Sequence, residues 1–189
     1  MANVFDTAGE AGTSQTRVER DPLGELEVPA DAYYGVQTAR AIRNFPISGR
    51  LPDEALVRAA VQVKKAAARA NHATGRLPDH LAAAIVQAAD EILGLAPDAD
   101  SPSGEALRVE LIANFRVDPF QAGAGVSHNM NTNEVLANRA IEILAENGIG
   151  SGRRGDYAVW GPGIDHSWEA KEDSVVITVR WPSSTSATS

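Results

Sequence analysis

The sequence predicts a mainly α-helical fold with one small β-hairpin near its start. Apolar residues recur at helical spacing in two long segments, residues 53–75 and 79–93, and prolines and glycines stand at their ends. Only 5% of the residues are aromatic although 43% are hydrophobic, so small aliphatic side chains must fill the core. Many of these are alanine, which favours helix because it loses no side-chain entropy there. With 189 residues, about one domain is expected.

Composition excludes several classes of function. The formal net charge of -8 repels phosphate backbones, so no nucleic-acid partner is expected. The absence of cysteine excludes disulfides and thiolate chemistry. No apolar run is long enough to span a bilayer and the start lacks a signal peptide, so we expect no membrane partner and a cytoplasmic location.

The histidines do not suggest a metal site or a catalytic triad. His72, His80, His128 and His166 show no ligand spacing with one another or with paired carboxylates. No nucleophile elbow is present either. We therefore expect no metal.

Residues 1–16 are small and polar, and we predict a disordered leader there. The sequence Asp21-Pro22-Leu23-Gly24 then favours a turn, because proline presets φ and glycine accepts a positive φ. The extended segments on either side are expected to pair as a hairpin.

Five helices are expected after the hairpin. A short one covers residues 35–43 and is stopped by Pro46. The second runs from Asp53 to Gly75. Its predicted core stripe is Leu56, Ala60, Val63, Ala67 and Ala70, with Lys64, Lys65 and Arg69 on the other face.

The third helix is expected from Asp79 to Leu93, with the stripe Leu81, Ile85, Ala88 and Ile92. A loop at 94–104 precedes a fourth helix at 105–115. Ser127 or Asn129 is expected to cap a fifth helix that ends near Gly148. Residues 174–181 have the β-branched content of a strand, and residues 182–189 are expected to be disordered.

Residues 121–134 carry the strongest chemical signal. A loop with Gly123 and Gly125 leads directly into a helix start, where unpaired amides and the helix dipole suit a carboxylate or phosphate. The spacing lacks the third glycine of a dinucleotide site and the lysine of a P-loop. Spacing alone therefore leaves two interpretations open, an ordinary capped turn and an anion site.

Asn131, Glu134 and Asn138 share one face of the fifth helix. One interpretation is a polar network that supports a substrate pocket. The other is a set of buried side chains bonded to neighbouring backbone. The sequence alone does not separate them.

Several segments together resemble the aspartate ammonia-lyases of the aspartase/fumarase superfamily. They are residues 17–38 (RVERDPLGELEVPADAYYGVQT), 40–48 (RAIRNFPIS), 63–71 (VKKAAARAN), 88–93 (AADEIL), 118–140 (DPFQAGAGVSHNMNTNEVLANRA) and 154–157 (RGDY). The resemblance covers roughly residues 17–166. Fumarases of the superfamily usually carry tryptophan where Tyr34 precedes Gly35, so the aspartases are the nearer match.

The resemblance implies reversible elimination of ammonia from L-aspartate to give fumarate, without an organic cofactor. A loop serine removes the Cβ proton, and hydrogen-bond donors stabilise the resulting dianion. The family implies a homotetramer whose active sites combine segments from three subunits. A small dicarboxylic acid is therefore the expected partner.

Carried over by residue, Ala124, Gly125, Val126 and Ser127 correspond to the first substrate-carboxylate segment of the family. Asn129 and Asn131 would support the pocket from the helix. The family often has threonine where this chain has Val126, so one side-chain hydrogen bond is lost. No catalytic residue is assigned.

The tail departs from the family pattern. Residues 161–166 (GPGIDH) resemble an altered His-Pro-Asn-Asp-His segment, and after His166 the resemblance stops. We therefore predict a lyase-like helical domain at 17–147, a divergent and partly disordered tail at 148–189, and no central helix bundle. The hypothesis is a truncated or frame-shifted chain that is inactive alone. The alternatives are a fumarase-type fragment and a non-enzymatic helical module that binds a full-length lyase or another partner.

Overall fold

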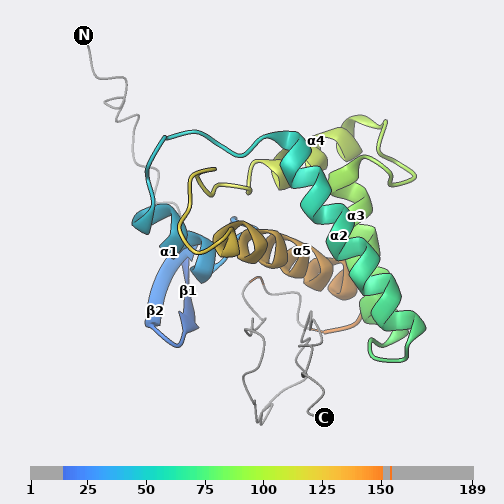
Figure 1. Cartoon of the computed structure of the whole chain (residues 1–189). Coiled ribbons are helices and arrows are strands. Elements are labelled where there is room, and N and C mark those ends of the chain that lie inside the picture. The colour runs from blue at the N-terminus through green and yellow to red at the C-terminus, as the bar shows by residue number, and fades with distance from the viewer. Residues whose placement is uncertain (1–14, 151–153, 155–189) are drawn as a thin grey trace, which may run out of the picture.

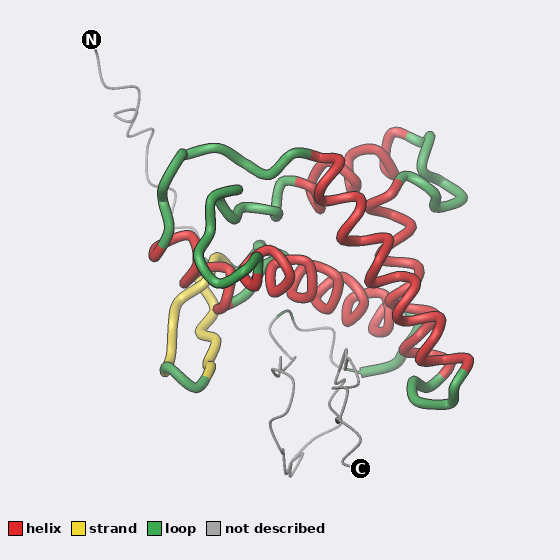
Figure 2. The backbone as a smooth tube through the Cα atoms, viewed as in Figure 1, coloured by secondary structure: helices red, strands yellow, loops and turns green. Residues whose placement is uncertain are grey.

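The computed structural model describes residues 15–150 and residue 154. The described part contains two strands and five helices in the order β1-β2-α1-α2-α3-α4-α5, which confirms the predicted mainly helical class with a hairpin near its start (Figure 1, Figure 2). The predictions for residues 161–166, 174–181 and 182–189, and for the leader up to residue 14, lie outside the described residues.

The predicted hairpin is present. Strand β1 (Thr16–Asp21) pairs antiparallel with β2 (Gly24–Pro29), and Asp21 stands opposite Gly24. Inside the turn the Leu23 amide donates to the Asp21 carboxylate at 2.9 Å, a local bond that aspartate commonly makes in turns. Strand β1 begins one residue inside the segment predicted as the leader.

Helix α1 (Val36–Asn44) has no capping side chain of its own, because Gly35 precedes it. The missing acceptors come from elsewhere in the chain. The Glu134 carboxylate accepts from the amides of Gly35 and Gln37 at 2.9 and 2.8 Å, and Glu19 accepts from the Val36 amide at 2.8 Å. These carboxylates satisfy the amides that a helix start leaves unpaired.

Helix α2 (Glu54–Ala73) lies within the predicted range 53–75, and Asp53 caps it by accepting from the Ala55 amide at 2.8 Å. Its predicted core face is wrong. The buried residues are Val57, Val61, Lys64 and Ala68. Leu56 and Val63 of the predicted stripe are 49% and 50% exposed.

Helix α3 (Asp79–Leu93) ends at Gly94 in the left-handed region. It buries Ile85, Ala88 and Ile92 as predicted, whereas Leu81 of the predicted stripe is only partly buried. Helix α4 (Pro102–Ile112) begins three residues earlier than expected. The physical reason is its cap: the Ser101 hydroxyl accepts from the Gly104 amide at 3.0 Å, and proline suits the first helical position.

Helix α5 (Val126–Glu146) follows Gly125, which has φ 79°. The predicted caps Ser127 and Asn129 are wrong, since both lie inside the helix. The chain enters α5 through left-handed backbone, which glycine adopts without a steric cost. Among the described residues, no side chain accepts a capping hydrogen bond at the start of this helix.

Helix α5 lies at the centre of the described part. Helices α2 and α3 pack along it, and α1 with the hairpin lies at its N-terminal end (Figure 1). Its buried residues Val135, Leu136, Ala140, Ile143 and Leu144 join residues of α2, α3 and α4 in one core cluster. No helix in residues 15–150 is both long enough and apolar enough to cross a bilayer.

Candidate functional site

The loop that leads into α5 is the first part of the candidate site. Gly123, Ala124 and Gly125 have φ angles of 76°, 54° and 79°, so three successive residues adopt left-handed backbone. A Cβ atom built on Gly123 or Gly125 would meet nothing within 4 Å. The backbone here is therefore open to an approaching ligand.

The amides of this loop are mostly unpaired. The Val126 amide donates to the Gly123 carbonyl at 3.2 Å, and the Asn129 amide donates to the Gly125 carbonyl at 3.2 Å. Within the described part of the chain, the amides of Ala124, Gly125, Ser127 and His128 have no acceptor. Free N–H groups at a helix start, together with the helix dipole, are suited to an anion.

The side chains of the loop contribute little to such a site. Val126 is 58% exposed and offers no hydrogen-bonding group. The half-buried Ser127 hydroxyl makes no hydrogen bond within residues 15–150. Any anion binding at this loop would therefore depend on the backbone and on this hydroxyl.

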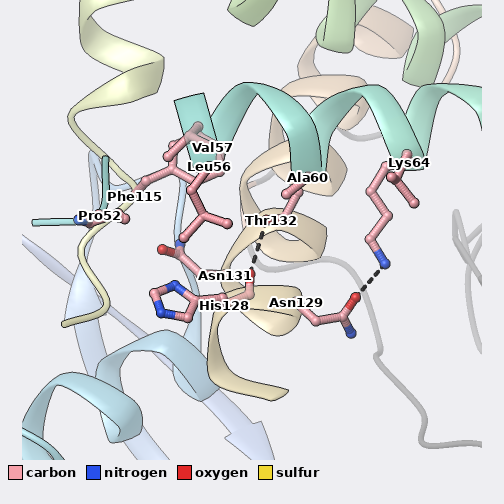
Figure 3. Close-up of a pocket in the computed structure, with 11 residues that line it drawn as sticks. Pro52, Leu56, Val57, Ala60, Lys64, Phe115, His128, Asn129, Asn131 and Thr132 are labelled. Carbon is pink, nitrogen blue, oxygen red and sulfur yellow. Dashed lines mark hydrogen bonds between the residues drawn. The ribbon is translucent and has the colours of Figure 1, made fainter. Parts of the chain in front are cut away.

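A cavity of about 230 Å³ lies between α2 and the first turns of α5 (Figure 3). Its wall is mostly apolar, and its polar groups come from one lysine of α2 and from α5. The lining residues are Pro52, Leu56, Val57, Ala60, Val63, Lys64, Phe115, His128, Asn129, Asn131 and Thr132. Of the six predicted site residues, Asn129 and Asn131 line the cavity, whereas Ala124, Gly125, Val126 and Ser127 do not.

Lys64 is a cavity residue that the sequence analysis missed. It is 7% exposed, and its Nζ donates to Asn129 Oδ1 at 2.5 Å (Figure 3). Burial lowers the pKa of the Lys64 ammonium group. The signal available in the sequence is its spacing, three residues after Val61 and seven after Val57, which puts it on the face that proves to be the core.

The polar row on α5 binds neighbouring backbone, which is the second of the two interpretations left open by the sequence. Asn131 accepts from the Arg116 amide and donates to the Asn114 carbonyl, both at 3.0 Å. Asn138 donates to the Tyr33 carbonyl at 2.8 Å. Glu134 caps α1, and burial raises the pKa of this carboxyl group although its hydrogen bonds act in the opposite direction.

Asp118 holds the loop before α5 in place. Its carboxylate accepts from the amides of Ser48 and Gly49 at 2.6 and 2.9 Å and from the Phe120 amide at 2.9 Å. Burial alone would raise the pKa of Asp118, but these hydrogen bonds outweigh it and lower the pKa. The segment after α1 and the segment before α5 are thus tied together beside the candidate site.

The contacts of Tyr33 are structural. The Tyr33 hydroxyl donates to Glu142 at 2.7 Å, and the Arg154 guanidinium lies 3.6 Å from the ring centroid. Arg154 also pairs with Glu142 at 2.6 Å and donates to the Asp31 carbonyl. Burial and the Glu142 carboxylate raise the pKa of Tyr33. Among the described residues, no group of three or more potential metal ligands is present.

Comparison with known proteins supports the resemblance. The sequence model of the family described as Lyase matches residues 24–151. The chain is 52% identical over 130 residues to the class II fumarate hydratase of Halobacterium salinarum, covering 69% of this chain and 25% of that enzyme. It is 47% identical over 147 residues to the aspartate ammonia-lyase of Bacillus subtilis, covering 77% and 26%.

A solved structure shows the same fold. The crystal structure of a fumarate lyase:delta crystallin from Brucella melitensis matches with a TM-score of 0.60 and 46% identity, covering 75% of this chain and 29% of that one. The chain spans about a quarter of the length of the curated relatives it matches. Aspartases and fumarases match at similar identity, so the comparisons establish the superfamily and not the substrate. The matched segments, the helical fold and the family model together show that this chain belongs to the lyase family of the aspartase/fumarase superfamily and corresponds to its N-terminal part.

Proposed function

We propose that residues 123–128 form a carboxylate-binding segment of an aspartase-type lyase, which eliminates ammonia from L-aspartate to give fumarate. The observation that carries the proposal is the row of unpaired amides at the start of α5. They lie in the stretch that resembles the first substrate-carboxylate segment of the family. The ligand class is a small dicarboxylic acid, as the names of the relatives suggest for those enzymes.

The chemistry follows from what amide donors do for an anion. Removal of the Cβ proton from aspartate places a second negative charge on the neighbouring carboxylate. Preorganised N–H groups that point at this charge stabilise the transition state more than the ground state. The four unpaired amides of the loop, from Ala124, Gly125, Ser127 and His128, would supply such donors. Asn129 and Asn131 hold the helix start against α2 and residues 114–116.

We assign no catalytic base to residues 24–151. The resemblance places the serine that acts as base in a segment which this stretch does not match. Absence of a general base typically costs about 10²–10⁴-fold in rate. We therefore propose that this chain alone binds the dicarboxylate without measurable turnover, and that a working site requires further segments.

Amide NMR of the chain titrated with fumarate tests the binding. We expect saturable shifts of the Ser127 and His128 amide signals. Val126→Thr restores the hydroxyl that the family often has, and it should tighten binding by about threefold to tenfold, the usual gain from one added hydrogen bond. Val126→Ala is the matched control without a hydroxyl. Unshifted amides in the wild-type chain would refute the proposal.

Substrate preference separates aspartase from fumarase. L-aspartate should bind more tightly than L-malate in the same titration, and a fumarate absorbance assay should show no turnover of either by the chain alone. Tighter binding of malate would favour the fumarase-type alternative. Turnover of aspartate would disprove our proposal that the chain alone is inactive.

Assembly and location follow from the same proposal. We propose that the chain acts in the cytoplasm and, in the complete enzyme, within a homotetramer, as the family resemblance implies. Half-exposed Leu56 and Val63 leave apolar surface for association. Light scattering on the purified chain, alone and mixed with a full-length aspartate ammonia-lyase, measures whether it associates.

A further inference from the structure

The cavity between α2 and α5 has the features of a binding site in its own right. One part of its wall is apolar, formed by Leu56, Val57, Ala60, Val63 and Phe115. Lys64 is the cation of this cavity, and it lies beside Asn129 (Figure 3). Small-molecule sites commonly combine an apolar wall with a few placed polar groups.

Lys64 is incompletely paired. An ammonium group carries three N–H donors, and within the described part of the chain Lys64 has one acceptor, Asn129 Oδ1. The residue is 7% exposed, so it has little access to water that could take the remaining donors. A buried charge without a counter-ion is costly, and an anionic oxygen in the cavity would relieve that cost.

A second unpaired polar atom lines the same cavity. His128 Nε2 is buried and has no hydrogen-bond partner among the described residues. In the tautomer that carries the proton on Nε2, this atom is a donor. Two residues of the cavity, Lys64 and His128, thus hold donor capacity that none of the described residues uses.

We propose that this cavity binds a small monocarboxylate with an apolar body, with the carboxylate on Lys64 and the body against Leu56 and Val63. The cavity volume of about 230 Å³ is below the range typical of sites for drug-sized ligands, which limits the ligand to a single ring or a short chain. The proposal does not rest on the dicarboxylate function of the loop. It uses different donors, and Leu56 and Val63 lie on α2.

Benzoate and benzamide form a matched pair of probes, since they share a shape and differ in charge. Methyl NMR of the full chain should show saturable shifts at Leu56 and Val63 with benzoate, and binding of benzamide at least about tenfold weaker. Equal binding of the two probes would overturn the role of the charge. Unmoved methyl signals with benzoate would overturn the site.

Two variants test Lys64 directly. Lys64→Met keeps the length of the side chain and removes its charge, and it should weaken benzoate binding at least about tenfold. Asn129→Asp supplies a carboxylate to Lys64 from within the protein, so it should compete with benzoate while the fold is kept. If Lys64→Met fails to fold, Asn129→Asp still tests whether benzoate binds at Lys64. Unchanged benzoate affinity of Asn129→Asp would contradict the proposal.

Fumarate distinguishes this inference from the proposed function. A short dicarboxylate without an apolar body should shift the Ser127 and His128 amides and leave the Leu56 and Val63 methyls in place. Benzoate shifts at Leu56 and Val63 without any fumarate shifts would support benzoate binding in the cavity and refute fumarate binding at the loop. Fumarate shifts at the loop without benzoate shifts at Leu56 and Val63 would support the loop site and refute the cavity site.

Discussion

Lys64 is a charged residue in an environment that disfavours charge. It lies between Val61 and Ala68 on the buried face of α2, and among residues 15–150 its one hydrogen-bond acceptor is Asn129. Burial lowers its pKa from 10.5. The folded state therefore releases the lysine proton at a lower pH than the unfolded chain does.

This pKa shift predicts how stability depends on pH. Between the lowered pKa and about 10.5 the unfolded chain binds more protons, so the free energy of unfolding should rise with pH across that window. Lys64→Met should remove this rise. Urea unfolding of wild type and variant at about pH 7 and about pH 10 measures it. A difference between the two proteins that stays constant with pH would contradict the expectation.

Ala124 and Gly125 offer a matched pair of substitutions in left-handed backbone. Ala124 has φ 54° and Gly125 has φ 79°. A side chain in this region costs roughly 1–2 kcal/mol. Gly125→Ala should therefore destabilise the protein by about that amount, whereas Ala124→Gly should leave the free energy of unfolding unchanged or raise it by up to about 1 kcal/mol. The urea midpoints of the two variants measure these changes. Equal losses of unfolding free energy for both substitutions would show that φ strain is not the cause.

Helix α2 presents two apolar faces, and the structure buries one of them. Val57, Val61 and Ala68 pack into the core, while Leu56 and Val63 line the cavity and remain half exposed. Within residues 15–150, α2 thus keeps an apolar surface beside α5 that the other described elements leave half exposed.

Val61 and Val63 test this assignment with the same chemical change. Val61 is 0% exposed, so Val61→Ala should lower the free energy of unfolding by about 2 kcal/mol. Val63 is 50% exposed, and Val63→Ala should cost less than about 0.5 kcal/mol. Thermal or urea unfolding compares them. A larger loss at Val63 would mean that the predicted stripe is the true core face.

The same helix shows where sequence reasoning succeeds. Proline, aspartate and glycine at the helix ends act locally, so the bounds of α2 and α3 were predictable. The buried face of α2 was not predictable, because Lys64 interrupts its true core stripe and makes that stripe look polar. Only a residue 65 positions away, Asn129, explains why a lysine is tolerated there.

The candidate site also has one part that the sequence predicts and one part that it does not. The glycine loop at 123–125 was visible in the sequence, because positive φ and an open backbone are properties of glycine itself. The cavity was not visible, since α2 and α5 come together only in the folded chain. The roles of Asn131 and Asn138 depend on backbone carbonyls and amides far along the chain, which side-chain spacing does not reveal.

At the scale of the whole molecule, one carboxylate joins two parts of the fold. Glu134 belongs to α5 yet accepts from the amides of Gly35, Gln37 and Thr38 at the start of α1. The hairpin contributes Glu19 to the same helix start. The packing of α1 and the hairpin on the helical core therefore depends on buried hydrogen bonds as well as on apolar contact.

Glu134→Gln should weaken that connection. The amide keeps one acceptor oxygen but places NH₂ donors opposite backbone N–H groups, so we expect a loss of about 2–3 kcal/mol. Hydrogen exchange of the Gln37 and Thr38 amides should accelerate more than that of the α3 core. The exposed Glu27, on β2, gives the control Glu27→Gln, which should change little. Uniform acceleration throughout the chain would argue against a local role.

The capping of α1 by Glu134, a residue of α5, also has a consequence for synthesis. A nascent chain emerges from its N-terminus, and residues 36–44 leave the ribosome long before residue 134 does. During that interval three amides at the start of this helix lack the acceptor that they have in the finished protein. Helix α1 is thus secured only after residue 134 has been made, and until then water must satisfy these three amides.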